Sequence, residues 1–254
     1  MLELNKIYCM DNIDGMKLLD ENSIDLTITS PPYDNLRNYN GFSWDFEGVA
    51  KQLYRITKIG GIVVWVVGDK IIKGNKTLTS FKQALFFQEC GFNMHDTMIY
   101  RKKNTPFMRS NAYTNCFEFM FVLSKGVPKT FNPIKEKTVR SGFEMLVSNK
   151  GADAKNNKIM KELKTEKTKT NIWDYAVGLG GSTKDKEAFK HPAIFPEKLA
   201  QDHILSWSNC GDIIFDPMCG SGTTCKMAKL NNRNYIGFET SQEYCDIAEK
   251  RLDF

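Results

Sequence analysis

Short apolar runs that are rich in isoleucine and valine recur along the chain and are bounded by polar or turn residues. The three clearest are Ile24 to Thr29, Gly61 to Val67 and Asp212 to Phe215. Their short length, their isoleucine and valine content and their polar or turn boundaries predict buried strands of a parallel sheet. Further strands are expected at Thr97 to Arg101, Phe117 to Ser124 and Asn234 to Phe238.

Segments with helical periodicity separate these runs. They are Phe46 to Lys58, Ser80 to Cys90, Pro196 to Ser208 and a closing segment from Ser241 to about Leu252. The proline that opens the third segment suits a first helical turn. Because strands and helices alternate, the pattern predicts an α/β fold with helices on both faces of the sheet.

The pattern changes between roughly Thr130 and Lys190. Six lysines between 151 and 170 are mixed with Asn, Thr and Gly and show little apolar periodicity, so an inserted loop region or small subdomain is expected. Five of these lysines recur every three residues: Lys155, Lys158, Lys161, Lys164 and Lys167. On a helix they would form a positive stripe, which is either a solvated face or a set of phosphate contacts.

Composition limits the class of protein. With 254 residues, 41% of them hydrophobic and 12% aromatic, the chain can bury a full core. The net charge of +5 is mild and permits a polyanionic partner without requiring one. The longest apolar run, Ile62 to Val67, is too short to cross a bilayer, and Met1 to Met10 lacks a signal-peptide pattern, so a soluble, cytoplasmic protein is expected.

The seven cysteines are scattered, with no CxxC pair, and only three histidines accompany them. This pattern predicts reduced, mostly buried thiols and no bound metal.

The loop Thr29-Ser30-Pro31-Pro32-Tyr33 directly follows the first predicted strand. Its two prolines lack N–H groups and fix φ, so they end the strand and make the loop rigid. Ligands of open α/β sheets bind at the carboxyl ends of the strands, which is where this loop lies. By itself the tetrapeptide is also compatible with a plain strand-terminating turn and a core tyrosine.

Methylation of a base amino group would use these residue types. The lone pair of that nitrogen is delocalised into the ring, so hydrogen-bond acceptors must draw its two hydrogens out of the ring plane. The Ser30 hydroxyl and the Pro31 carbonyl are suitable acceptors, and the rigid loop fixes their position. Tyr33 offers an aromatic face on which a base swung out of the duplex can stack.

A second loop, from Asp216 to Thr224, is glycine-rich and follows the third apolar run. Gly220 and Gly222 permit positive φ and a close approach of a ligand to the backbone, and Asp216 can hold the amino group of a zwitterionic cofactor. These features suit the methionine moiety of S-adenosylmethionine, whereas the GK[ST] ending of a phosphate-binding loop is absent. Glu239 ends the next predicted strand, where nucleotide-binding folds place a carboxylate on the ribose hydroxyls.

TSPPY followed much later by FDPMCGSGTT resembles the β class of DNA amino-methyltransferases, in which the catalytic motif precedes the cofactor motif. The resemblance runs from about Asp11 to Glu239 and is weakest in the middle. It implies a Rossmann-like methyltransferase fold, with a mixed, mostly parallel sheet flanked by helices and one reversed strand near the C-terminal end of the sheet. It also implies three parts: residues 1–129 as the catalytic half, 130–190 as a lysine-rich target-recognition insertion and 191–254 as the cofactor-binding half.

Carried over position by position, the resemblance makes Ser30, Pro31, Pro32 and Tyr33 the catalytic loop. The cofactor contacts that it implies are Asp11, His191, Pro192, Phe195, Asp216, Cys219, Gly220, Gly222, Thr223 and Glu239.

Within this set, the segment His191 to Pro196 would close over the methionine end, and Asp11 would contact the adenine. A helix cap is nearly as good an interpretation of Asp11, and His191 would serve equally as a packing residue. The loop Asn35 to Trp44, with Arg37 and Tyr39, would contact DNA, close over the pocket or pack as an ordinary loop.

The implied activity is site-specific methylation of an exocyclic amino group in double-stranded DNA, with S-adenosylmethionine as the methyl donor. In this family SPPY is more often associated with cytosine N4, and DPPY or NPPY with adenine N6. We therefore favour cytosine N4 because of Ser30, and keep adenine N6 as the alternative. A partner restriction nuclease is a matter of gene context, and the oligomeric state stays open.

Other functions fit less well. Cytosine C5 methylation needs a cysteine nucleophile, usually carried on a Pro-Cys dipeptide, and the chain has none. Methyltransferases that act on protein glutamine typically carry asparagine at the position of Ser30, and the resemblance disfavours RNA as the substrate. A non-catalytic DNA-binding module would not need an intact acceptor loop together with an intact glycine turn.

Overall fold

The computed structural model describes residues 2–32, 45–104, 110, 112–139, 142–148, 157–191, 194 and 196–254. The chain divides into two compact units. The first consists of Met1–Asn132 together with Asn171–Phe254, and the second of Pro133–Thr170.

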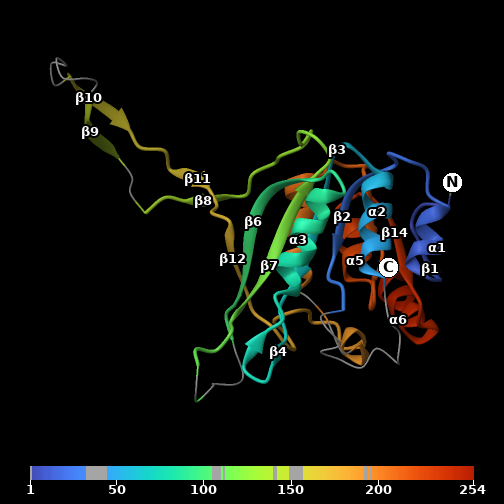
Figure 1. Ribbon diagram of the computed structural model, residues 1–254. Coiled ribbons are helices and arrows are strands. Elements are labelled where there is room, and N and C mark those ends of the chain that lie inside the picture. Colours follow the sequence, from blue (N-terminus) through green and yellow to red (C-terminus); the bar gives the residue numbers. More distant parts are fainter. Residues whose placement is uncertain are drawn as a thin grey trace. The chain divides into compact units, whose positions relative to one another are not determined.

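An eight-stranded sheet of order β1-β14-β13-β2-β3-β7-β6-β12 forms the first unit. Its strands in chain order are β1 (Lys6–Cys9), β2 (Ile24–Thr29), β3 (Thr57–Val67), β6 (Asn93–Lys102), β7 (Phe117–Ser124), β12 (Ile172–Tyr175), β13 (Ile213–Asp216) and β14 (Asn234–Glu239). All described neighbours in this sheet pair in parallel except β7, which is antiparallel to both β3 and β6 (Figure 1).

The mixed, mostly parallel sheet that the sequence predicts is therefore confirmed. The one reversed strand of this sheet among the described residues is β7, which lies third from the edge formed by β12. β7 lies between β3 and β6 and forms antiparallel hydrogen bonds with both.

Helices cover both faces of the sheet. They are α1 (Asn12–Lys17), α2 (Phe46–Ile56), α3 (Thr79–Glu89), α4 (Glu197–Trp207), α5 (Thr223–Leu230) and α6 (Gln242–Leu252), with a short 3₁₀ turn η1 (Glu187–Lys190). α1 packs on α2 and α2 on α3, whereas α4 packs on α5 and α5 on α6. Figure 1 shows α2 and α3 on the near face of the sheet.

The central strand β3 shows why long apolar runs form here. Val63, Trp65 and Val67 lie in the apolar cluster that β3 shares with α2 and α3. Ile62 and Val64, which alternate with them, are just as deeply buried. A strand covered on both faces needs apolar residues at consecutive positions. The apolar run Gly61 to Val67 therefore predicted a buried strand correctly.

The second unit consists of two antiparallel strand pairs. They are β8 (Lys135–Lys137) with β11 (Glu166–Thr168), and β9 (Phe143–Ser148) with β10 (Asn157–Glu162). This unit is shorter than the region 130–190 that we expected as an insertion. The chain rejoins the main sheet as β12, which pairs with β6 from Ile172 opposite Ile99.

The helix that would turn the lysine repeat into a stripe is absent from the described part of this unit. Lys158 and Lys161 belong to β10 and Lys167 to β11, while Lys164 lies between these strands; Lys155 is outside the described residues. A helix needs an apolar face to bury, and this segment has none, whereas strand pairing satisfies its backbone without one.

Two further expectations concern cysteines and membrane spans. All seven cysteines are free, but only Cys219, Cys225 and Cys245 are buried, and Cys9 and Cys210 are exposed. The expectation of mostly buried thiols was therefore wrong. Among the described residues, no helix has the length and apolar character that a bilayer crossing would need.

Candidate functional site

The candidate catalytic loop leaves the sheet at the end of β2, which lies between β13 and β3. Thr29 is fully buried opposite Trp65 of β3. Ser30 follows as a half-buried residue and Pro31 as a buried one. The Ser30 hydroxyl and the Pro31 carbonyl therefore belong to a loop that starts from the sheet interior.

Several predicted residues of this loop lie outside the described part of the chain. They are Tyr33 and the residues Asn35 to Trp44, including Arg37, Tyr39 and Trp44. Their roles stay predictions.

The candidate cofactor loop follows β13, the parallel neighbour of β2, with Phe215 opposite Thr27. Because parallel strands end at the same edge of a sheet, this pairing brings the two predicted loops together. Gly220 and Gly222 have φ values of 50° and 76°, in the left-handed region that favours glycine. The turn leads directly into α5, which begins at Thr223.

Gly220 lies against the imidazole of His191. A Cβ atom added at Gly220 would come within 2.8 Å of His191 Nε2, so only glycine fits at this position. The imidazole is buried, and its ring centroid lies 4.4 Å from that of Tyr244. His191 is thus a packing residue that also places its segment on the glycine turn; Pro192 and Phe195 are outside the described residues.

Gly222 has a different reason for being glycine. Its added Cβ would come within 2.8 Å of the Cβ of Ala248 in α6, and its N–H donates to the Cys219 carbonyl at 2.7 Å. We expected a ligand to approach the backbone here. The close packing of α6 on the turn by itself requires glycine at this position, and the approach of a ligand stays a prediction.

Glu239 joins the glycine turn to the end of β14. One carboxylate oxygen accepts a hydrogen bond from Gly220 N at 3.0 Å. The other accepts from Thr240 N and Ser241 N, both at 2.9 Å. Backbone amides from two loops therefore hold this carboxylate beside the turn.

Asp11 lies at the same edge of the sheet, because β1 is the parallel neighbour of β14. Its Oδ1 accepts hydrogen bonds from Ile13 N at 2.8 Å and Asp14 N at 3.1 Å and so caps α1. Met10 N, one residue earlier, donates to the Glu239 carbonyl at 2.8 Å. The helix-cap interpretation of Asp11 is therefore confirmed, and the residue also lies next to the end of the strand that carries Glu239.

Asp216 ends β13 and has only 1% of its surface exposed. Its Oδ1 accepts a hydrogen bond from Met218 N at 3.1 Å. Burial raises the pKa of this carboxyl to about 7, although the Thr29 and Thr224 hydroxyls and the Met218 amide favour its charged form. A cationic group beside Asp216 would stabilise the carboxylate and lower that pKa.

Cys219 contributes to the turn as a small buried side chain. A hydrogen bond with Cys225 and then burial raise the pKa of its thiol well above the usual value. A thiol that stays protonated is a poor nucleophile, so Cys219 does not have the character of a reactive cysteine.

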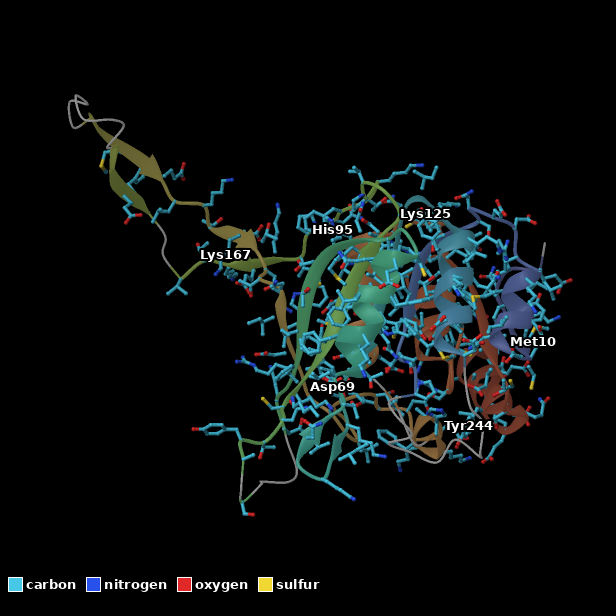
Figure 2. The ribbon with its side chains drawn as sticks, in the orientation of Figure 1. Met10, Asp69, His95, Lys125, Lys167 and Tyr244 are labelled. Atoms are coloured by element: carbon cyan, nitrogen blue, oxygen red, sulfur yellow. The ribbon has the colours of Figure 1, made fainter. Side chains whose placement is uncertain are left out.

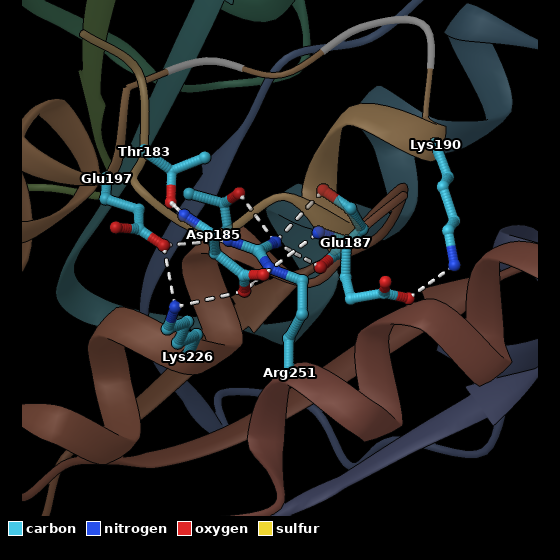
Figure 3. A network of polar contacts seen from close by, with 9 residues as sticks. Thr183, Asp185, Glu187, Lys190, Glu197, Lys226 and Arg251 are labelled. Atoms are coloured by element: carbon cyan, nitrogen blue, oxygen red, sulfur yellow. Dashed lines mark hydrogen bonds and ion pairs between the residues drawn. The ribbon is translucent and has the colours of Figure 1, made fainter. Parts of the chain in front are cut away.

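A buried arginine, Arg251 of α6, holds the far side of the turn (Figure 3). Its side chain is 1% exposed. One guanidinium nitrogen donates to the Ser221 carbonyl, to Ser221 Oγ at 3.1 Å and to Thr223 Oγ1 at 3.2 Å. The predicted cofactor residue Thr223 thus has its hydroxyl engaged with Arg251.

Two carboxylates balance the charge of this arginine. Arg251 donates to Asp185 at 2.8 Å and to Glu197 at 2.8 Å, and Lys226 pairs with the same two residues at 3.4 Å and 2.9 Å. Burial alone would raise the pKa of Asp185, but the hydrogen bond and charge of Arg251 bring it below the usual value. Figure 3 shows this network joining Asp185 to Glu197 of α4, Lys226 of α5 and Arg251 of α6.

The sequence did not indicate this network. Its four charged residues lie far apart in the sequence, with 66 positions separating Asp185 from Arg251. Each of them belongs to an ordinary polar helix or loop pattern. Only the arginine in the last turn of the closing helix is a recognisable feature, and such residues usually serve the helix dipole. No local motif predicts that Arg251 contacts the glycine turn, because that contact forms only when distant segments fold together.

Comparison with known proteins shows which family these features belong to. The model of the N6/N4 DNA methylase family matches residues 24–250. The orphan methyltransferase M.BamHII of Bacillus amyloliquefaciens is 56% identical over 239 residues, covering 91% of this chain and 89% of the relative. The type II methyltransferase M.HinfI of Haemophilus influenzae is 31% identical over 275 residues, covering 98% of this chain and 68% of the relative.

Solved structures share the fold. The cytosine-N4-specific PvuII DNA methyltransferase superposes with a TM-score of 0.70 at 19% identity, covering 97% of this chain and 86% of that one. TTHA0409 of Thermus thermophilus, a protein described as a DNA modification methylase and solved in complex with S-adenosylmethionine, gives a TM-score of 0.66 at 20% identity, covering 97% and 92%. The family match over most of the chain, together with the two sequence relatives, shows that this chain belongs to the N6/N4 family of DNA methyltransferases.

Proposed function

We propose that this DNA methyltransferase methylates the N4 amino group of cytosine in double-stranded DNA; adenine N6 is the alternative. The observation that carries the proposal is the meeting of two loops at one sheet edge, one beginning with Ser30-Pro31-Pro32 and the other with Asp216 and the glycine turn. Ser30 is the feature that favours cytosine within this family.

S-adenosylmethionine is the cofactor of the proposed reaction, and the chemistry of the site fits it. Asp216 provides a buried carboxylate for the amino group, and Glu239 provides a carboxylate for the ribose hydroxyls. Asp11 lies at the neighbouring strand end, where the adenine would lie. When bound, S-adenosylmethionine supplies the methyl group from its positively charged sulfur.

Ser30 and Pro31 prepare the base nitrogen. The hydroxyl oxygen of Ser30 and the carbonyl of Pro31 accept the two amino hydrogens, which draws them out of the ring plane and frees the lone pair. Tyr33 stacks on the base after it leaves the duplex. The methylated nitrogen carries a positive charge and sheds its proton readily, so the residues of this loop need no strong base.

The roles of the remaining parts are also proposed. Residues 133–170 form the separate unit inside the region 130–190, and we assign target recognition to them. Exposed lysines of this unit, such as Lys135 and Lys137, suit contact with a phosphate backbone. The catalytic half then precedes this unit and the cofactor-binding half follows it.

Identification of the methylated nucleoside tests the proposed function directly. The protein is incubated with unmethylated duplex DNA and S-adenosylmethionine, the DNA is digested, and the nucleosides are analysed by mass spectrometry. N4-methylcytosine is the expected product. N6-methyladenine would overturn the choice of base but not the reaction, and the absence of any methylated nucleoside despite cofactor binding would redirect the search to RNA or protein.

Substitutions in the catalytic loop should separate chemistry from cofactor binding. Ser30→Ala is expected to lower kcat by about 10²- to 10³-fold, as loss of one acceptor in a preorganised site does. Tyr33→Ala should abolish transfer because it removes the face on which the base stacks. Calorimetry should find nearly unchanged affinity for S-adenosylmethionine in both variants, and an equal loss of cofactor affinity would contradict these assignments.

Asp216→Asn should change the pH dependence of cofactor binding and of stability. The pKa of about 7 means that wild-type affinity for the cationic amino group rises as the pH rises through this value, whereas the variant binds weakly throughout. Because this pKa is raised on folding, the carboxyl stabilises the fold at low pH and that contribution is lost as the pH rises through about 7.

The stability of Asp216→Asn relative to wild type should therefore increase between about pH 4 and about pH 7, as measured by denaturant unfolding. A relative stability that stays flat over this range would show that Asp216 is not a buried carboxyl with a raised pKa. Undiminished cofactor affinity would remove it from the binding site.

Arg251→Lys should weaken cofactor binding through the turn. Lysine keeps the charge but has a single ammonium group, which cannot reproduce the planar fork that contacts Ser221, Thr223 and two carboxylates. We expect affinity for S-adenosylmethionine to fall about tenfold, the equivalent of about 1.4 kcal/mol. Lys250→Gln, at an exposed position of the same helix, is the control; a lower unfolding temperature with unchanged affinity would limit Arg251 to a structural role.

A further inference from the structure

A short β-hairpin projects from the chain between β3 and α3. It pairs β4 (Ile71–Ile72) with β5 (Asn75–Lys76), with Ile72 opposite Asn75. The two turn residues, Lys73 and Gly74, have φ values of 49° and 83°. Consecutive positive φ values are characteristic of a type I′ turn, whose twist matches that of the two strands. The hairpin is therefore a regular element and not an irregular loop.

Hydrogen bonds close the base of the hairpin and join the two segments that flank it. Thr77 N donates to the Lys70 carbonyl at 3.0 Å, which closes its base. The Asp69 carboxylate accepts from Ser80 N and from Ser80 Oγ, both at 3.0 Å, and so holds the start of α3 against the end of β3. These bonds give the hairpin a fixed position relative to the sheet.

The hairpin lies at the edge of the sheet that carries the catalytic loop. β3 runs parallel to β2, with Thr29 opposite Trp65, so the chain leaves both strands at the same edge. Figure 1 shows β4 at this end of the sheet. Figure 2 shows Asp69 at the base of the hairpin. Lys125, which follows the reversed strand β7, lies at the opposite end of the sheet.

The surface of the hairpin is cationic and partly apolar. Lys73 and Lys76 are exposed, and no carboxylate of the described residues forms an ion pair with either of them. Lys76 Nζ lies 5.7 Å from the centroid of the Phe117 ring. Ile72, the residue before Lys73, is 51% exposed. Lys103 adds another exposed cation where β6 ends, at the same edge.

A positive, rigid projection beside a site that acts on DNA is complementary to the phosphate backbone. We propose that the β4–β5 hairpin contacts the phosphates of the duplex beside the target base, through Lys73 and Lys76, with Ile72 packed against the adjacent sugar. These contacts would position the duplex over the catalytic loop without reading its sequence. The residues that make these contacts belong to the first unit, and the contacts do not involve residues 133–170. The proposal rests on the proposed function, in which DNA is the substrate.

The test removes the two charges while keeping the turn. Lys73→Asn combined with Lys76→Gln is suitable because asparagine tolerates the left-handed conformation of position 73. Lys129→Gln is the matched control, since Lys129 is exposed beyond the end of β7, at the opposite edge of the sheet. Fluorescence anisotropy measures the affinity of each protein for a DNA fragment that the wild type methylates, over a range of salt concentrations.

The double variant is expected to bind this fragment at least about tenfold more weakly at low salt, with a slope of log K against log salt smaller by about 1.8. The KM for DNA should rise, while kcat at saturating DNA and the Kd for S-adenosylmethionine stay unchanged. Lys129→Gln should behave as wild type in every assay.

Unchanged DNA affinity and salt slope in the double variant would overturn the proposal, as would an equal loss in Lys129→Gln, which would indicate a diffuse charge effect. A change of oligomeric state in place of DNA affinity, measured by analytical ultracentrifugation, would assign the hairpin to contact between copies of the chain. Failure of the wild type to methylate any DNA would instead contradict the proposed function, so the two failures are distinguishable.

Discussion

The parallel pairing of β2 with β13 is the interaction on which the candidate site depends. The two strands come from opposite ends of the chain, yet Phe215 lies opposite Thr27 and both strands end at one edge. Their residues are buried on both faces, so a shift by one residue would turn every side chain to the other face of the sheet. The roles proposed for Ser30 and Asp216 therefore require that this register is kept.

The turn after β13 is held from several directions before any ligand arrives. The carboxylate of Glu239 accepts from Gly220 N, the imidazole of His191 fills the space that a side chain at position 220 would need, and Arg251 binds the other side of the turn. In the proposed role of this turn, a backbone that is already fixed would lose little entropy on binding the cofactor. The paired charges around Arg251 cancel, which lets this rigid support be buried without an uncompensated charge.

Local patterns predicted the parts of this architecture that rest on local physics. The bounds of β2 and β7 match the predicted strands Ile24 to Thr29 and Phe117 to Ser124, and the prolines after Thr29 mark the end of the first. The four-residue strand β12 was missed because it is too short for periodicity to show, and it is defined by its pairing with β6. The Arg251 network and the place of the reversed strand depend on contacts between distant segments, which no short window of sequence contains.

The choice of base depends on a different kind of information from the chemistry of transfer. Cytosine and adenine present the same kind of amino group, so in the proposed reaction the Ser30 hydroxyl and the Pro31 carbonyl would activate either one. Discrimination must then come from contacts to the ring edges, where the two bases differ in donors and acceptors. The proposed contacts of the hairpin to phosphates and a sugar would not read the ring edges, but they would position the duplex relative to the pocket. Positioning by the first unit and base reading by other segments are therefore separable, and substitutions at Lys73 should alter affinity without altering which base is methylated.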